Sequence, residues 1–202
     1  MSDYKVIKGL KVPSVASDPS PATAGQMWYD TATEDLKYTT VAGAWSAGGT
    51  LNTGRNESAV AGIQTAALIF GGTTPAKTTN TESYDGSTWT EVNNLTLATS
   101  SMSRAGTQTA ALCVGGNHFG ISAVESWDGT SWTDNAASMN TTRSHAGGGG
   151  VQTAALAYGG QQTTMTSNSE TWNGTSWTEG NNLNTTLSLA CTDGTVTSAM
   201  AC

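Results

Sequence analysis

A repeat of 44 residues runs through most of this chain and limits what it can fold into. The segment Gln-Thr-Ala-Ala-Leu occurs three times at that spacing, at residues 64–68, 108–112 and 152–156. Pairs of glycines recur at the same step, at residues 71–72, 115–116 and 159–160. Such periods are typical of solenoids, propellers and other arrays in which neighbouring units bury each other's apolar faces. We therefore expect a repeat protein.

Each repeat is predicted to form four short β-strands. In the third repeat, strands are expected at residues 144–151, 154–158, 170–172 and 176–179. Tight hairpins are favoured by Asp-Gly and Asn-Gly pairs, which occur at residues 85–86, 128–129 and 173–174. Four strands in about 44 residues is the period of a propeller blade. The expected fold is all-β, with four-stranded antiparallel propeller blades preceded by an extended N-terminal arm.

Charge and cysteine content exclude several functions. The 202 residues include 8 Lys and Arg against 15 Asp and Glu, a net charge of −7. Such a chain lacks the basic face that nonspecific nucleic-acid binding needs, and no apolar run is long enough for membrane insertion. The three cysteines and two histidines do not have zinc-ligand spacing. We therefore predict no catalytic residue, no cofactor and no metal site, and the chain is not expected to be an enzyme.

The repeats resemble the kelch signature, in which an apolar residue and two glycines precede Glu-x-aromatic-Asp, Gly-x-x-Trp and Met-x-x-x-Arg. In the second repeat the first three elements stand at residues 113–116, 125–128 and 129–132, and Met-x-x-x-Arg follows at 139–143. The arginine is kept as Arg55 and Arg143 but is replaced by Thr99 and Leu187, and the Asp is replaced by Asn173. A contact made by this arginine between blades is therefore not expected in every repeat.

After an opening at residues 25–29, the chain contains the segments Gln-Thr-Ala-Ala-Leu, Ser-Trp-Thr-Glu and Leu-Asn-Thr. In these segments and their order it resembles kelch-type virion proteins of marine bacteriophages. This resemblance implies a virion structural protein in a tail fibre or similar appendage, bound to other virion proteins and touching a host-surface glycan or protein. Two alternatives stay open: a capsid decoration protein, and a glycan-binding or glycan-active propeller. A homo-oligomer is expected in each case.

The repeats suggest a division of the chain into an arm, residues 1–24, and a propeller, residues 25–202. The propeller would contain a degenerate blade at 25–50, repeats at 51–94, 95–138 and 139–182, and a partial repeat at 183–202. The partial repeat could complete the degenerate blade and close a four-bladed ring, or the array could be longer. The end of the chain inside an apolar strand favours the longer array.

Residues 1–24 are predicted to dock onto another protein. They contain spaced apolar residues that are too few to form a core: Val6, Ile7, Leu10, Val12 and Val15. No turn signal precedes Asp18, so the arm is expected to run extended and to add to a neighbour's sheet or lie in a groove.

The loops after the glycine pairs are the candidate recognition site, because they differ in sequence where the strands agree. Their candidate residues are Lys77, Asn117, His118, Phe119, Gln161 and Gln162. The periodic tryptophans, Trp45, Trp89, Trp132 and Trp177, are expected in the blade core rather than on sugars. The periodic Glu82, Glu125 and Glu170 are expected to support the fold rather than to act as an acid and base.

Overall fold

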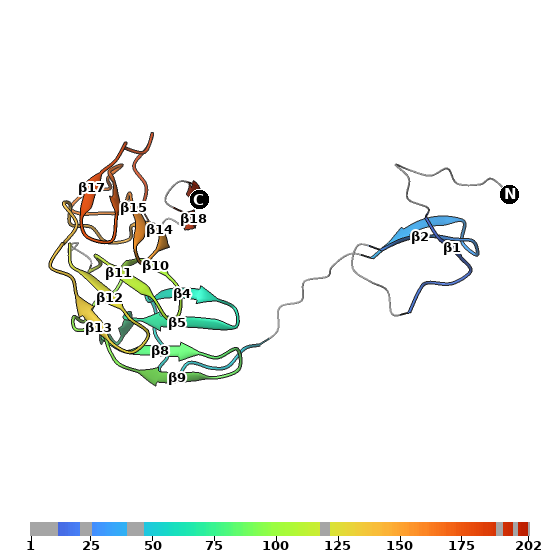
Figure 1. Ribbon diagram of the computed structural model, residues 1–202, viewed down its shortest axis with the longest axis horizontal. Coiled ribbons are helices and arrows are strands. Elements are labelled where there is room, and N and C mark those ends of the chain that lie inside the picture. Colours follow the sequence, from blue (N-terminus) through green and yellow to red (C-terminus); the bar gives the residue numbers. More distant parts are fainter. Residues whose placement is uncertain are drawn as a thin grey trace. The chain divides into compact units, whose positions relative to one another are not determined.

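The computed structural model describes residues 12–20, 26–39, 47–117, 122–188, 192–195 and 198–201. The chain divides into two compact units, Met1–Ala47 and Gly48–Cys202, and all regular structure in the described residues is β (Figure 1). The boundary differs from the expected one after residue 24. The segment expected to begin a degenerate blade lies instead in the same unit as the arm.

The first unit contains a three-stranded sheet of β1 (Ser14–Val15), β2 (Met27–Asp30) and β3 (Asp35–Tyr38). β2 and β3 form an antiparallel hairpin, but β1 pairs with β2 in parallel. A four-stranded antiparallel blade has no such parallel pair. This parallel pair joins the arm to the hairpin, with Val15 paired to Asp30 of its own unit. Residues 40–46 of the expected degenerate blade lie outside the described residues.

Asp18 and Asp30 hold this small sheet together. The indole Nε1 of Trp28, which is 4% exposed, donates to Asp18 Oδ1 at 3.1 Å. The Lys37 ammonium donates to the same Asp18 oxygen and to Asp30 Oδ2 at 2.6 Å. The Lys37 hydrogen bond, followed by that from the Ala32 amide, lowers the pKa of Asp30 to about 2. These bonds tie the described part of the arm to the hairpin.

The second unit contains three four-stranded antiparallel sheets, one for each repeat. The first sheet is β4 (Ala59–Ile63), β5 (Ala66–Phe70), β8 (Thr81–Tyr84) and β9 (Trp89–Val92). The second sheet is β10 (Ser103–Gly106), β11 (Ala111–Val114), β12 (Val124–Trp127) and β13 (Trp132–Asp134). The third sheet is β14 (Gly147–Val151), β15 (Ala154–Tyr158), β16 (Ser169–Trp172) and β17 (Trp177–Glu179). The prediction of four antiparallel strands in each of these repeats is confirmed.

Two further strand pairs complete the described structure of this unit. β18 (Thr192–Thr195) and β19 (Ser198–Ala201) form an antiparallel hairpin after the third sheet. β6 (Thr73–Thr74) and β7 (Ala76–Lys77) form a short ribbon inside the loop of the first sheet. The first strands of the sheets lie next to each other in chain order, with β10 contacting both β4 and β14, and β14 contacting β18.

The apolar cores lie between consecutive sheets rather than within each sheet. Phe70 of the first sheet packs on Trp132 of the second, with ring centroids 4.8 Å apart. The core between the second and third sheets combines residues such as Leu112 with Trp172 and Trp177. Trp132 and Trp177 are each 6% exposed, which confirms their expected core position.

The remaining tryptophans show how this core depends on a neighbouring sheet. Trp89 is only half-buried, because within the second unit no described sheet precedes its own. Trp127 and Trp172, which have less regular positions in the sequence, are as buried as the periodic ones. Trp45 lies outside the described residues.

The glycine pairs join one repeat to the next. The amides of Gly72, Gly116 and Gly160 donate to the carbonyls of Thr99, Arg143 and Leu187 in the following repeat. These three glycines have φ between 90° and 114°, a conformation that strains residues with a Cβ. A Cβ on Gly116 would also lie 2.4 Å from the Thr99 hydroxyl. The repeated Gly-Gly therefore marks a joint between sheets.

The hairpins between the last two strands of each sheet are capped by one side chain. Asp128 Oδ1 accepts hydrogen bonds from the amides of Thr130 and Ser131, both at 2.8 Å. Bonds from the Ser131 and then the Thr130 amide lower the pKa of Asp128. Asn173 Oδ1 accepts the same two bonds at 2.9 Å in the third sheet. The change from Asp to Asn keeps the acceptor, so the departure from the signature leaves this turn intact.

Candidate recognition face and its supporting framework

The candidate recognition loops lie beside the segments that lead into the first strands. Isolated β-bridges join Asn56 to Thr73 and Ser144 to Gln161. In the second repeat the Asn117 amide donates to the Ser100 carbonyl at 2.7 Å. We call the loops after the glycine pairs, together with the segments that lead into the first strands, the loop face. It consists of residues 55–58, 73–77, 99–102, 117, 143–146 and 161–165. The repeats thus present corresponding loops on one side of the second unit.

Three residues of the loop face have an unusual backbone conformation at the same repeat position. Glu57, Ser101 and His145 have φ of 54°, 58° and 55°, which is uncommon for residues other than glycine. The Ser101 amide donates to the Glu57 carbonyl at 2.9 Å, and the His145 amide donates to the Ser101 carbonyl at 2.8 Å. These bonds between successive repeats hold the strained conformation in place. Strained positions of this kind cluster at ligand-binding sites.

The side chains at these three positions differ although the backbone repeats. Glu57 is exposed, His145 is half-buried and Ser101 is 7% exposed. Glu57 Oε2 accepts a hydrogen bond from the Ser101 hydroxyl at 3.1 Å, and His145 Nδ1 lies 3.2 Å from the Ser144 hydroxyl. The loop face therefore carries an acid, a largely buried hydroxyl and an imidazole at one position of the repeating framework.

The residues expected from the sequence occupy different environments on this face. Lys77 is exposed on β7, whereas Gln161 and Gln162 are half-buried. Asn117 is half-buried at φ 60°, and its side-chain Oδ1 is buried without a hydrogen-bond donor. His118 and Phe119 lie outside the described residues. Sequence comparison of the loops alone missed Glu57, Ser101 and His145, although their 44-residue spacing is visible in the chain.

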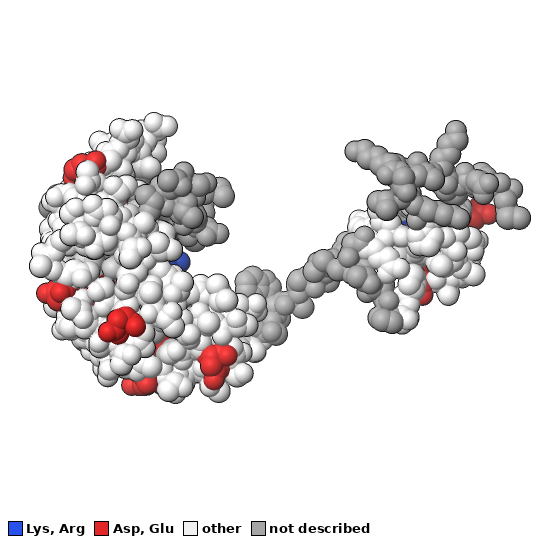
Figure 2. Space-filling view, in the orientation of Figure 1, with Lys and Arg blue, Asp and Glu red and all other residues white. Residues whose placement is uncertain are grey.

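Acidic residues are scattered on the face of the second unit that Figure 2 shows. There the Asp and Glu residues appear as separate spots rather than as one continuous acidic surface. Within the part of the chain that the structure describes, no three or more His, Cys, Asp or Glu side chains come together as a group that could hold a metal ion. The loop face is therefore suited to contacts made by several dispersed polar groups.

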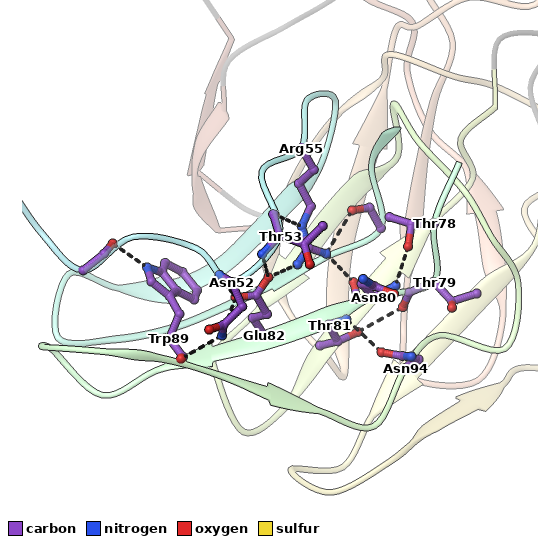
Figure 3. Close-up of polar contacts among 12 residues, drawn as sticks. Asn52, Thr53, Arg55, Thr78, Thr79, Asn80, Thr81, Glu82, Trp89 and Asn94 are labelled. Atoms are coloured by element: carbon purple, nitrogen blue, oxygen red, sulfur yellow. Dashed lines mark hydrogen bonds and ion pairs between the residues drawn. The ribbon is translucent and has the colours of Figure 1, made fainter. Parts of the chain in front are cut away.

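Buried arginine–glutamate pairs fix the segments that support this face. In the first repeat the Arg55 guanidinium bonds to the Glu82 carboxylate and to the carbonyl of Asn80 (Figure 3). In the third repeat Arg143 Nη2 lies 2.5 Å from Glu170 Oε1, and both side chains are fully buried. Each glutamate also accepts hydrogen bonds from two successive backbone amides of the preceding loop. Both pairs lie within one repeat, so these periodic glutamates anchor their own loop.

A glutamine in each of the second and third repeats connects its sheet to the preceding one. Gln108 Nε2 donates to the Tyr84 carbonyl at 2.5 Å, and Gln152 Nε2 donates to the Trp127 carbonyl at 2.5 Å. Gln64 has the equivalent place in the first repeat and is exposed. Within the described ranges it makes no such bond to an earlier sheet.

Replacing Gln152 by alanine is expected to lower the free energy of unfolding of the second unit by about 1–2 kcal/mol, because buried carbonyls would lose their donor. Gln64→Ala is the matched control and is expected to change it by less than about 0.5 kcal/mol, as for an exposed surface residue. Urea unfolding followed by circular dichroism measures both. Equal effects of the two changes would contradict a role in joining sheets.

An open groove of about 460 Å³ lies between the first and second sheets. It is lined by Glu91, Val92, Asn93, Trp127, Gly129 and Thr130. Trp127 is only 2% exposed, and its indole Nε1 donates to the Gln108 carbonyl. The Asn93 amide already donates to the Thr130 carbonyl at 2.8 Å. The groove thus offers no free aromatic face on which a sugar could stack.

The first unit exposes an apolar face. Met27, Leu36 and Tyr38 are 45%, 54% and 66% exposed, and strand alternation with the β2–β3 register places them on the same side of the sheet. Of the docking residues expected in the arm, Val12 and Val15 are half-buried, while Val6, Ile7 and Leu10 lie outside the described residues. The alternating apolar residues of β2 and β3 indicate this face in the sequence. The sequence prediction instead placed docking on the apolar residues of the arm.

Comparisons with known proteins do not assign the chain to a family. No protein-family model matches the chain, and no curated protein sequence matches it. In the described segments, no helix has the length and apolar character needed to cross a membrane.

Proposed function

We propose that this chain is a bacteriophage virion structural protein, part of a tail fibre or similar appendage, whose three sheets are blades of a kelch-type propeller. The first unit docks onto other virion proteins, and the loop face of the second unit contacts the host surface. The observation that carries this proposal is that the backbone of the loop face repeats while its side chains differ from one repeat to the next. Glu57, Ser101 and His145 keep one backbone conformation but differ in chemistry, as suits recognition on a rigid scaffold.

The apolar face of the first unit supports the docking part of the proposal. Met27, Leu36 and Tyr38 expose large apolar side chains on a unit separate from the repeats. Groups of exposed apolar residues commonly mark contact surfaces between proteins. The proposal therefore places docking on this face of the first unit, which also contains residues 1–24.

The position of the chain in purified phage particles tests the proposal. We expect immunogold electron microscopy to label an appendage, and quantitative mass spectrometry to give a few to some dozens of copies per particle. Hundreds of copies over the shell would instead identify a capsid decoration protein. Absence of the chain from purified particles would overturn the proposal.

Binding of the full chain to host cells tests the role of the loop face. A variant with Glu57→Ala, Lys77→Ala and His145→Ala is expected to lose most binding. A variant with Glu91→Ala and Asn93→Ala in the groove is the control and is expected to bind normally. The reverse result, with glycan-array signals lost in the groove variant, would favour a glycan-binding propeller.

A further inference from the structure

The second repeat buries a glutamate that lacks the arginine of its neighbours. Glu125 is 4% exposed and accepts hydrogen bonds from the amides of Thr96 and Leu97, at 2.7 and 3.0 Å. Thr99 stands where the first and third repeats have Arg55 and Arg143. Within the described residues no Lys, Arg or His pairs with Glu125. A buried carboxylate without a compensating charge is strongly destabilising.

The backbone around Glu125 matches that of the repeats with arginine. In the third repeat the guanidinium of Arg143 donates to the carbonyls of Thr141, Gly159 and Asn168 and to Glu170. The first repeat has the same four bonds from Arg55. The strands that carry these acceptors pair in the same register in all three sheets.

The corresponding acceptors in the second repeat are all oxygens. They are the carbonyls of Leu97, Gly115 and Ala123 and the carboxylate of Glu125. The Thr99 hydroxyl is a further oxygen at this position, and it donates a long hydrogen bond of 3.5 Å to the Gly115 carbonyl. The Gly115 amide bonds to the Ala123 carbonyl at 2.9 Å, just as the Gly159 amide bonds to the Asn168 carbonyl. The shorter side chain of threonine thus leaves these oxygens without the five donors of a guanidinium.

Among the described residues, the titratable side chains opposite Glu125 in the strand registers are Cys113 on β11 and Asp134 on β13, and neither supplies a positive charge. Cys113 lies opposite Glu125 in the register of β11 and β12. Burial, followed by the negative charge of Glu125, raises the pKa of the Cys113 thiol. The raised pKa keeps this thiol from supplying a counter-charge to the carboxyl group of Glu125.

We propose that the second repeat binds a monovalent metal ion, K⁺ or Na⁺, at the position that the arginine guanidinium occupies in the other repeats. Backbone carbonyls and carboxylates are the oxygen ligands that hard cations take, and carbonyl rings bind K⁺ in selective channels. A single positive charge balances the single carboxylate. The ion stabilises the segment of the loop face that contains Ser101.

Thermal unfolding of the full chain at constant ionic strength tests this site. K⁺ or Na⁺ replaces N-methylglucamine in the buffer, and circular dichroism gives the midpoint. A ligand that binds only the folded state at about 100 times its Kd is expected to raise the midpoint by about 5–10 °C. The more effective ion identifies the preferred occupant. No rise with either ion, as for a protonated Glu125, would overturn the proposal.

Three variants separate this site from general salt effects. Thr99→Arg supplies the missing guanidinium and is expected to abolish the dependence on the ion while keeping the fold. Arg143→Thr is expected to create a second dependence in the third repeat. Gln64→Ala, an exposed change in the first repeat, is the control and is expected to keep the wild-type response. An equal response of wild type and Thr99→Arg would overturn the site.

Crystals soaked in rubidium chloride give an independent measurement. An anomalous peak among Thr99, Gly115 and Glu125 is expected in the wild type and not in Thr99→Arg. A peak elsewhere only would refute the assignment. None of these outcomes depends on where the protein resides in a particle, so the ion site and the proposed function can fail separately.

Discussion

Replacing Arg143 by alanine is expected to lower the free energy of unfolding of the second unit by about 3–5 kcal/mol, the usual cost of removing one partner of a buried ion pair. Arg143 is 1% exposed and bonds to fully buried Glu170, which would remain as a buried charge with only its backbone and Asn140 donors. Denaturant unfolding monitored by circular dichroism measures the loss.

The double variant Arg143→Ala with Glu170→Gln is the control for this change. Removing the charge together with its partner is expected to recover part of the stability, because the neutral amide costs less to bury. A double variant that is less stable than Arg143→Ala alone would show that packing of the arginine stem, rather than the unpaired charge, dominates.

Replacing Trp132 by alanine is also expected to lower the free energy of unfolding by about 3–5 kcal/mol, as in other truncations of large buried aromatics. Trp132 is 6% exposed and packs on Phe70 of the first sheet and on Trp127 of its own sheet. Its indole Nε1 donates to the Thr81 hydroxyl at 3.1 Å. The change therefore removes a core side chain and a buried hydrogen bond between two sheets.

Trp89→Ala is the matched control for Trp132→Ala, because Trp89 has the same repeat position but is half-buried. We expect it to cost clearly less than Trp132→Ala. The two losses are compared by urea unfolding in the same buffer. Similar losses would mean that the tryptophan stabilises its own sheet rather than the core between sheets.

The sequence predicted the sheets of the second unit well because their signals are local and repeated. The Gly-Gly pairs, the Asp-Gly and Asn-Gly turns and the periodic Trp132 and Trp177 all have the roles that their spacing indicates. Repetition makes the strand prediction more secure, because the same pattern of residues occurs in three repeats. A chance resemblance in one repeat is not supported by the others.

The contacts that depend on tertiary pairing were not predictable in the same way. Nothing in the order of residues indicated that β1 would pair in parallel with β2, since Ser14 and Val15 carry only a weak strand pattern. The pairing of Arg143 with Glu170 could not be predicted either, because 27 residues separate them in the chain. The strained backbone at Ser101 depends on hydrogen bonds from neighbouring repeats, which no single repeat specifies.

The joints at Gly72, Gly116 and Gly160 each connect a sheet only to the one that follows. Energetic coupling in such a chain passes between nearest neighbours, so its stability behaves as a sum of terms for the units and for their interfaces. The second and third sheets each have a described neighbour on both sides, so we expect them to open later in native-state hydrogen exchange than the first sheet. Damage to one sheet is therefore expected to weaken its direct neighbours more than sheets further along the chain.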